Sequence, residues 1–269
     1  MTFDLSGRIA VVTGAGGLLG RQHVAALAEA GARVVAVDCE DARLAHAGWL
    51  APRGKGRVLT FGADVTEPDS VGDLRRFVLE QCGQIDVLVN NAAIDDKVEG
   101  SLDAGAASRF EEYPLAQWRR VLEVNVTGVF LTSQVLGAEM ARRGSGSIVN
   151  VASTYGLVGP DPSLYAQPDG TRPFVKAPAY PASKGAVIAF TRYLAAYWGE
   201  SGVRVNALAP GGVENGQAPY FIENYARRTP LGRMAAPDDY RGALVFLASD
   251  GSRYMTGATL VVDGGFTAW

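Results

Sequence analysis

The chain is poor in cysteine and histidine, which limits two kinds of chemistry. Its 269 residues include only two cysteines, Cys39 and Cys82, and no Cys-x-x-Cys pair. Two cysteines cannot form a framework of disulfides. The two histidines, His23 and His46, have no acidic or thiol neighbours at the spacing of metal ligands. We therefore expect no metal site.

Excess charge and long apolar runs are also scarce. The 25 basic and 28 acidic residues give a net charge of −3, so we expect no basic face for nucleic acid. No uninterrupted apolar run approaches the ~20 residues of a membrane span. The N-terminal segment carries an acid at Asp4 and lacks the apolar core of a signal peptide. These features predict a cytoplasmic protein with no membrane segment.

Short β-branched runs alternate with longer helical segments along the whole chain. Most runs are continuous rather than alternating, as expected for parallel strands buried on both faces. The runs are Ile9–Val12, Val34–Val37, Val58–Phe61, Val87–Val89, Ile148–Val151, Val203–Leu208 and Thr259–Val262. Helices are predicted over Leu19–Ala30, from about Ser70 to Cys82, from near Pro114, after Pro181 and over Pro237–Ser249. The pattern predicts one α/β domain, residues 1–269, with a doubly wound seven-stranded parallel sheet and helices on both faces.

Two segments interrupt this alternation. Gly156–Ala179 contains five prolines, which exclude a long helix or a central strand, so we predict an extended surface loop there. Ala93–Tyr113 is the second irregular stretch. A loop as long as Gly156–Ala179 in a compact domain usually has a function or is mobile.

A glycine-rich turn joins the first strand to the first helix. Its glycines allow a close approach of a pyrophosphate, and the helix N-terminus offers unpaired N–H groups. Asp38 ends the second strand, 24 residues after Gly14, near the spacing at which an acid meets the ribose of a dinucleotide. Cys39 follows it rather than an arginine, which favours NAD over NADP. A plain turn, and an N-cap role for Asp38, are the structural alternatives. The predicted phosphate-binding residues are Gly14, Gly16, Gly17, Leu18, Leu19 and Gly20.

Polar residues also follow the third and fourth strands. Asp64 and Val65 come after the third strand, and Asn90 and Ala92 come at and after the end of the fourth. In open α/β sheets, ligands bind at the carboxyl ends of the strands. Asn90 also has a purely structural interpretation as a turn residue.

Tyr180 and Lys184 lie one helical turn apart at the start of a predicted helix. They project from the same face, and a nearby ammonium lowers the pKa of a phenol that otherwise titrates near 10. Such a phenol suits general acid–base chemistry, although the pair alone is also typical of an amphipathic surface. Ser153 follows the fifth strand, where its hydroxyl can hold a substrate oxygen or simply cap a turn.

Asn125 falls within the apolar stripe of the long helix that begins near Pro114. A buried amide is costly unless it is hydrogen-bonded. Asn125 therefore either braces a neighbouring segment or organises a path for protons.

Taken in order, these motifs resemble those of the short-chain dehydrogenase/reductase family, whose fold is of the Rossmann type. The resemblance runs from about Arg8 to the end and includes Pro210-Gly211-Gly212-Val213. It implies that Tyr180 is the general acid/base and that Ser153 polarises the reacting oxygen. Lys184 would lower the pKa of Tyr180 and hold the nicotinamide ribose, while Asn125 would hold a water of a proton relay. It further implies an NAD cofactor, a homotetramer, no catalytic metal and further cofactor contacts from Asp64, Val65, Asn90, Ala92, Pro210, Gly211 and Val213.

The chain departs from the family pattern in three places. Leu18 stands in the glycine turn, Asn215 replaces a threonine after Val213, and 26 residues separate Ser153 from Tyr180. That insertion begins after Ser153 and ends before Tyr180, so both of its ends flank the reaction centre. We therefore predict a substrate lid at about 156–179. Its polar side chains, with Arg172 and Lys176 as candidate substrate contacts, fit a sugar, polyol or sugar acid. The alternative is an oligomer contact.

The sequence thus predicts an NAD-dependent dehydrogenase that acts on a secondary alcohol or hemiacetal of a sugar-like molecule. Substrate contacts are expected from Ser153, Tyr180, Arg172 and Lys176. A reductase of 3-oxoacyl thioesters is the first alternative, and Asp38 argues against the 2′-phosphate that such enzymes often use. A catalytically silent NAD-binding regulator is the second, disfavoured because a sensor needs no acid/base.

Overall fold

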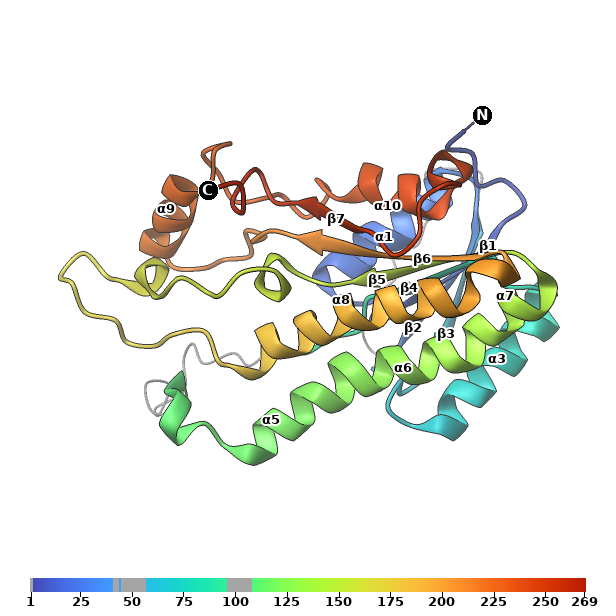
Figure 1. Ribbon diagram of the computed structural model, residues 1–269, viewed down its shortest axis with the longest axis horizontal. Helices are drawn as coiled ribbons and strands as arrows, with labels where there is room; N and C mark the ends of the chain where they lie inside the picture. Colours follow the sequence, from blue (N-terminus) through green and yellow to red (C-terminus); the bar gives the residue numbers. More distant parts are fainter. Residues whose placement is uncertain (1, 41–43, 45–56, 96–107) are drawn as a thin grey trace.

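The computed structural model describes residues 2–40, 44, 57–95 and 108–269. Seven parallel strands form one sheet in the order β3-β2-β1-β4-β5-β6-β7 (Figure 1). The strands are β1 Ile9–Thr13, β2 Arg33–Asp38, β3 Val58–Gly62, β4 Val87–Asn90, β5 Gly146–Val151, β6 Val203–Pro210 and β7 Thr259–Val262. All seven predicted strands are therefore confirmed, as is the doubly wound topology. The chain order reverses between β1 and β4, and the neighbouring strand ends diverge there.

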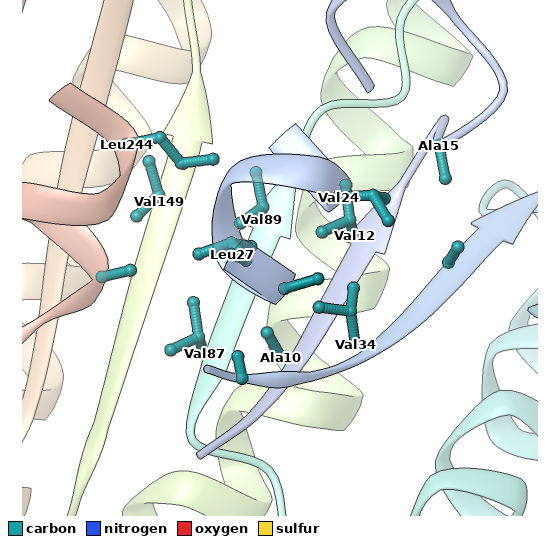
Figure 2. Packing of buried hydrophobic residues seen from close by; sticks show 14 of the residues in the cluster. Ala10, Val12, Ala15, Val24, Leu27, Val34, Val87, Val89, Val149 and Leu244 are labelled. Carbon is teal, nitrogen blue, oxygen red and sulfur yellow. The ribbon is translucent and has the colours of Figure 1, made fainter. Parts of the chain in front are cut away.

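Helices cover both faces of the sheet, which explains the continuous apolar runs. On one face, Ala10 and Val12 of β1 belong to one apolar cluster with Leu27 of α1 (Leu18–Glu29), and in the same cluster Leu244 of α10 (Arg241–Ala248) lies beside Val149 of β5 (Figure 2). On the other face, the alternate β1 residues Ile9 and Val11 pack with residues of α3 (Pro68–Cys82), of the segment 115–143 and of α8 (Ala179–Trp198). Because both faces of each central strand are buried, successive residues are all apolar.

The helix predicted from near Pro114 is a continuous segment with two π-helical turns. It consists of α5 (Leu115–Leu122), the π turn η3 (Glu123–Thr127), α6 (Gly128–Thr132), the π turn η4 (Ser133–Gly137) and α7 (Ala138–Arg143). By length and composition alone, this segment is long and apolar enough to cross a membrane. The sequence analysis did not predict this, because the segment contains no uninterrupted apolar run of ~20 residues. Half of its most apolar stretch is buried against the rest of the protein, as in a core helix.

The remaining elements differ from the predictions in two respects. The predicted start of the last helix, Pro237–Ser249, is wrong, because α10 begins at Arg241. A helix that the sequence analysis missed, α9 (Pro219–Arg228), lies at the carboxyl end of the sheet (Figure 1). Short 3₁₀ turns complete the described part: η2 (Phe110–Glu112), η5 (Thr154–Gly156), η6 (Pro162–Tyr165), η7 (Gly199–Ser201) and η8 (Asp250–Ser252). His46 and most of the irregular stretch Ala93–Tyr113 lie outside the described residues.

Candidate active site

The glycine turn between β1 and α1 is shaped by contacts that exclude larger residues. Gly14 has φ = +61°, and a Cβ there would lie 2.7 Å from the Cα of Ala92. A Cβ at Gly20 would lie 2.1 Å from the carbonyl oxygen of Gly14. Gly17, the N-cap of α1, offers no side-chain hydrogen bond to the first turn. The first N–H groups of α1 are therefore suited to an anion such as a pyrophosphate.

The turn is fastened to the segment after β4 by Thr13 and Asn91. The Thr13 hydroxyl accepts hydrogen bonds from the N–H groups of Asn91 and Ala92, each at 3.1 Å. The Asn91 amide donates to the carbonyl oxygens of Thr13 and Gly14 at 2.9 and 3.0 Å. Asn91 thus holds the turn in place and lines the cleft, a part that the sequence analysis did not give it.

Asn90, predicted to contact the cofactor, turns its side chain into the interior instead. Its Nδ2 donates to Oδ1 of Asn150 at 2.8 Å, and its Oδ1 accepts the hydroxyl hydrogen of Thr132 at 2.8 Å. Asn150 in turn donates to Thr191 on α8 at 2.9 Å. This buried chain joins the helices to the centre of the sheet. Since the amide of Asn90 is fully engaged, a cofactor contact at this residue is left to its main chain.

Asp38 lies at the end of β2 and borders a cleft of about 530 Å³. Its Oδ2 accepts the N–H of Gly16 at 2.9 Å, and its Oδ1 accepts the N–H of Glu40 at 3.3 Å. These bonds tie the carboxylate to the glycine turn. Other predicted residues lining the same cleft are Gly14, Gly17, Leu18, Leu19, Gly20, Asp64, Val65 and Ala92. This set of donors and acceptors, with a helix N-terminus, fits the adenosine and pyrophosphate half of a dinucleotide.

A second cleft of about 300 Å³ adjoins the first and shares Leu19, Asn91 and Ala93 with it. We call it the catalytic cleft. It brings together residues predicted from widely separated parts of the sequence: Ser153, Lys176, Tyr180, Lys184, Pro210, Gly211 and Val213. The predicted residue Arg172 is exposed and is not among the described residues that line it.

Tyr180 and Lys184 lie together at the start of α8, but their electrostatics differ from the prediction. The Lys184 ammonium is 5.6 Å from the centre of the Tyr180 ring and donates to the carbonyl oxygen of Val151 at 2.7 Å. Burial raises the pKa of Tyr180 and the charge of Asp95 adds to the rise, whereas a hydrogen bond with Ser153 lowers it. Burial lowers the pKa of Lys184 to about 8, against the charge of Asp95. The expected net lowering of the Tyr180 pKa is absent, because burial and the charge of Asp95 outweigh the hydrogen bond with Ser153.

Asn125 lies in the π turn η3 and is 1% exposed. Its Oδ1 accepts the N–H of Ile94 at 2.8 Å. Its Nδ2 donates to the carbonyl oxygen of Ile94 and to the hydroxyl of Ser183, both at 3.0 Å. Ser183 donates onward to the carbonyl oxygen of Tyr180 at 2.7 Å. Of the two alternatives, these contacts favour bracing by the side chain, and the relay stays a prediction.

The insertion at 156–179 packs on α9 beside the catalytic cleft. The ring of Tyr165 lies 5.3 Å from that of Phe174 and 5.2 Å from that of Phe221, measured between ring centres. The amide of Asn224 donates to the carbonyl oxygens of Leu164 and Ala166 at 3.1 and 2.9 Å. The insertion contributes Tyr165 and Lys176 to the lining and therefore forms one wall of the catalytic cleft.

Several residues of the catalytic cleft were missed by the sequence analysis: Asp95, Tyr155, Gln217, Phe221, Tyr225 and Met234. Gln217 holds the loop after β6, since its amide donates to the carbonyl oxygen of Val213 at 2.9 Å. The same side chain accepts the N–H of Asn215 at 2.7 Å. The apolar and aromatic residues after Pro219, a proline typical of a helix start, are the signal that predicts α9. Asp95 carried no local signal beyond its position after a strand.

No group of three His, Cys, Asp or Glu side chains able to hold a metal ion occurs in the described part of the chain.

The chain matches a protein-family model and is similar to known dehydrogenases. A family model described as "Enoyl-(Acyl carrier protein) reductase" matches residues 14–267. The chain is 37% identical over 273 residues to galactitol 2-dehydrogenase (L-tagatose-forming) of Cereibacter sphaeroides, covering 99% of this chain and 98% of that one. It is 37% identical over 265 residues to cis-4-hydroxycyclohexanecarboxylate dehydrogenase of Sinomonas cyclohexanicum, covering 97% of each.

Among solved structures, the chain resembles a gluconate 5-dehydrogenase of Burkholderia cenocepacia in complex with NADP and tartrate. The identity is 30% and the TM-score 0.82, over 100% of this chain and 98% of that one.

Proposed function

The chain belongs to the short-chain dehydrogenase/reductase family, and we propose that it is an NAD-dependent dehydrogenase that oxidises a secondary hydroxyl of a polyol or sugar. One observation carries this proposal. Ser153, Tyr180 and Lys184 line a single cleft that adjoins the cleft suited to a dinucleotide. The similarity to galactitol 2-dehydrogenase supports a substrate of the polyol class.

The proposed chemistry assigns one task to each side chain. The residues lining the two adjoining clefts would hold the nicotinamide cofactor, which would supply the hydride acceptor for the carbon that bears the hydroxyl. Tyr180 takes the hydroxyl proton, and Ser153 holds the reacting oxygen by a hydrogen bond. Lys184, held by the carbonyl oxygen of Val151, places a positive charge beside Tyr180 and so favours the phenolate form that accepts this proton and becomes a neutral phenol.

NAD is proposed over NADP because of the acidic surroundings of the ribose position. The carboxylate of Asp38 is 4% exposed and fixed by the N–H of Gly16, at the border of the dinucleotide cleft. Glu40 and Asp64 line the same cleft. A 2′-phosphate there would face negative charge, whereas a ribose diol can donate to a carboxylate. The NADP complex of the Burkholderia relative shows that the fold also accommodates the phosphorylated cofactor.

We further propose that copies of this chain assemble, as predicted for a homotetramer. On α8, the rings of Tyr193 and Tyr197 are stacked with centres 5.9 Å apart, and the two side chains are 60% and 65% exposed. Phe130 on α6 is 43% exposed, and its ring lies next to the ring of Phe190 on α8. A row of exposed aromatic rings is typical of an interaction surface.

The two cysteines are free, in keeping with a proposed cytoplasmic location.

A reductase of acyl thioesters is the second candidate, favoured by the description of the matching family model. Against it, Asp95, Lys176 and Gln217 give the catalytic cleft a polar wall. A long acyl chain lying against this wall would remove the polar groups from water without offering them a hydrogen bond, which costs free energy.

The proposal is tested by measuring NAD reduction with polyols, sugars, sugar acids and simple secondary alcohols. Tyr180→Phe should lower turnover by roughly 100- to 10,000-fold, the range for loss of a general acid/base, while NAD binding stays within about twofold. Tyr254→Phe is the matched control, because it removes the same hydroxyl from a fully exposed position. No oxidation of any alcohol, or full turnover in Tyr180→Phe, would refute the proposal. A silent regulator would bind NAD and keep its partner response in Tyr180→Phe.

A further inference from the structure

Asp95 and Lys176 form an ion pair in the wall of the catalytic cleft. Asp95 follows β4, whereas Lys176 belongs to the insertion, 81 residues later in the sequence. Their side chains are 41% and 16% exposed, and both line the cleft. The pair is therefore within reach of a ligand and yet is partly removed from solvent.

The pair lies next to the proposed acid/base. The Lys176 ammonium is 4.6 Å from the centre of the Tyr180 ring, closer than the 5.6 Å of Lys184. Asp95 is near enough for its charge to act on both Tyr180 and Lys184. A substrate that presents one hydroxyl to Tyr180 therefore has its neighbouring carbons beside the pair.

The two side chains complement a hydroxyl group and not a carboxylate. The carboxylate of Asp95 only accepts hydrogen bonds and the ammonium of Lys176 only donates them, whereas a substrate hydroxyl does both. Together the two charges cancel, so the pair does not attract an anion, and a substrate carboxylate would meet the negative charge of Asp95. The remaining charged residue of the described cleft lining, Lys184, is directed at Tyr180 and the carbonyl oxygen of Val151.

We propose that Asp95 and Lys176 bind a second hydroxyl, one or two carbons from the one oxidised, and so select neutral polyols and sugars over sugar acids. This inference rests on the proposed function and narrows its substrate class. It also revises the expectation for the insertion: Lys176 acts with Asp95 on a neutral ligand, and the exposed Arg172 does not take part.

The test compares a six-carbon alditol (galactitol), its aldonate (galactonate) and 2-butanol, which lacks the second hydroxyl. Asp95→Asn and Lys176→Met should each lower kcat/KM for galactitol by roughly 10- to 100-fold, as expected for loss of a hydrogen bond to a charged group. Because the charge of Asp95 also acts on Tyr180 and Lys184, the deciding quantity is the ratio of kcat/KM for galactitol to kcat/KM for 2-butanol, which each substitution should lower by roughly 10-fold or more. Asp95→Asn should improve galactonate relative to galactitol, because the repelling charge is gone.

Asp73→Asn and Arg76→Met are the matched controls, since they alter an exposed pair on α3 with 3.0 Å between the charged atoms. Both should behave as the unmodified enzyme with all three compounds. The inference is overturned if Asp95→Asn and Lys176→Met keep the full preference for galactitol, or if the unmodified enzyme prefers galactonate.

A binding experiment separates this inference from the proposed function. Tyr180→Phe loaded with NAD should bind galactitol in calorimetry, and adding Asp95→Asn should weaken that binding by roughly 10-fold. If the unmodified enzyme oxidises no alcohol, the proposed function fails while this titration still decides the role of the pair. Unweakened binding in the double variant, or no binding of galactitol to the Tyr180→Phe holoenzyme, overturns the inference.

Discussion

The side chain of Asn125 clasps the main chain of Ile94, accepting its N–H at 2.8 Å and donating to its carbonyl oxygen at 3.0 Å. This double contact joins the π turn η3 to the segment after β4, where Ile94 borders the dinucleotide cleft. The third bond, to Ser183, reaches the first turns of α8. One buried amide thus ties a wall of the cofactor cleft to the helix that carries Tyr180.

Asn125→Ala should lower the free energy of unfolding by about 3 kcal/mol, since each buried group left without a partner costs ~1–3 kcal/mol. Urea unfolding measures the change. Gln134→Ala, at an exposed position of the same long helix, should cost far less.

The same variant decides between the two roles considered for Asn125. If the side chain braces the cleft, Asn125→Ala should raise KM for NAD and leave the shape of the kcat–pH profile unchanged. A proton relay would instead move the profile while KM for NAD stays the same. Unchanged unfolding together with a displaced profile would contradict the bracing role.

Asp38→Asn should weaken the preference for NAD over NADP by roughly 10- to 100-fold. The substitution keeps an oxygen for the N–H of Gly16 and removes the negative charge that would meet a 2′-phosphate. Initial rates with both cofactors at varied concentration give the ratio of kcat/KM. An unchanged ratio would show that Asp38 does not set the choice, and Asp73→Asn on α3 controls for loss of a surface charge.

His23 should make the fold sensitive to mild acid. It is fully buried on α1, and burial lowers its pKa to about 4 from the usual 6.5. Between these values the unfolded chain binds a proton that the folded chain does not, so stability falls as pH falls through this window. Through His23 alone, the free energy of unfolding should be about 3 kcal/mol higher above pH 6.5 than at pH 4 and below.

Urea unfolding of the unmodified chain and of His23→Leu, at pH 7 and in steps down to pH 4.5, measures this dependence. The difference in unfolding free energy between the two chains should change with pH in favour of the variant as the solution becomes more acidic. A difference that is constant across the range would rule out His23 as the source.

Replacing the exposed rings of α8 should separate the copies. Tyr193→Asp together with Tyr197→Asp places two charges on the stacked pair and should split the assembly into smaller species in sedimentation velocity. Tyr254→Asp, which changes another exposed tyrosine, should keep the assembly. A monomeric unmodified protein would instead refute the proposed homotetramer.

The sequence by itself predicted the sheet because its signals are local. A strand buried on both faces must be apolar at successive positions, so Val34–Val37 and Ile148–Val151 are visible without any partner. The glycine turn is equally local, since the contact between Gly14 and Gly20 spans six residues. The pair Tyr180 and Lys184 follows from helical geometry alone.

Only the tertiary structure decided which side chains meet. Lys176 pairs with Asp95 and Asn125 clasps Ile94 because packing brings distant segments together, and no periodicity within either segment encodes its partner. Burial likewise raised the pKa of Tyr180, where the sequence offered only the nearby charge of Lys184. Contacts and desolvation depend on the surroundings in three dimensions, and these exist only once the chain has folded.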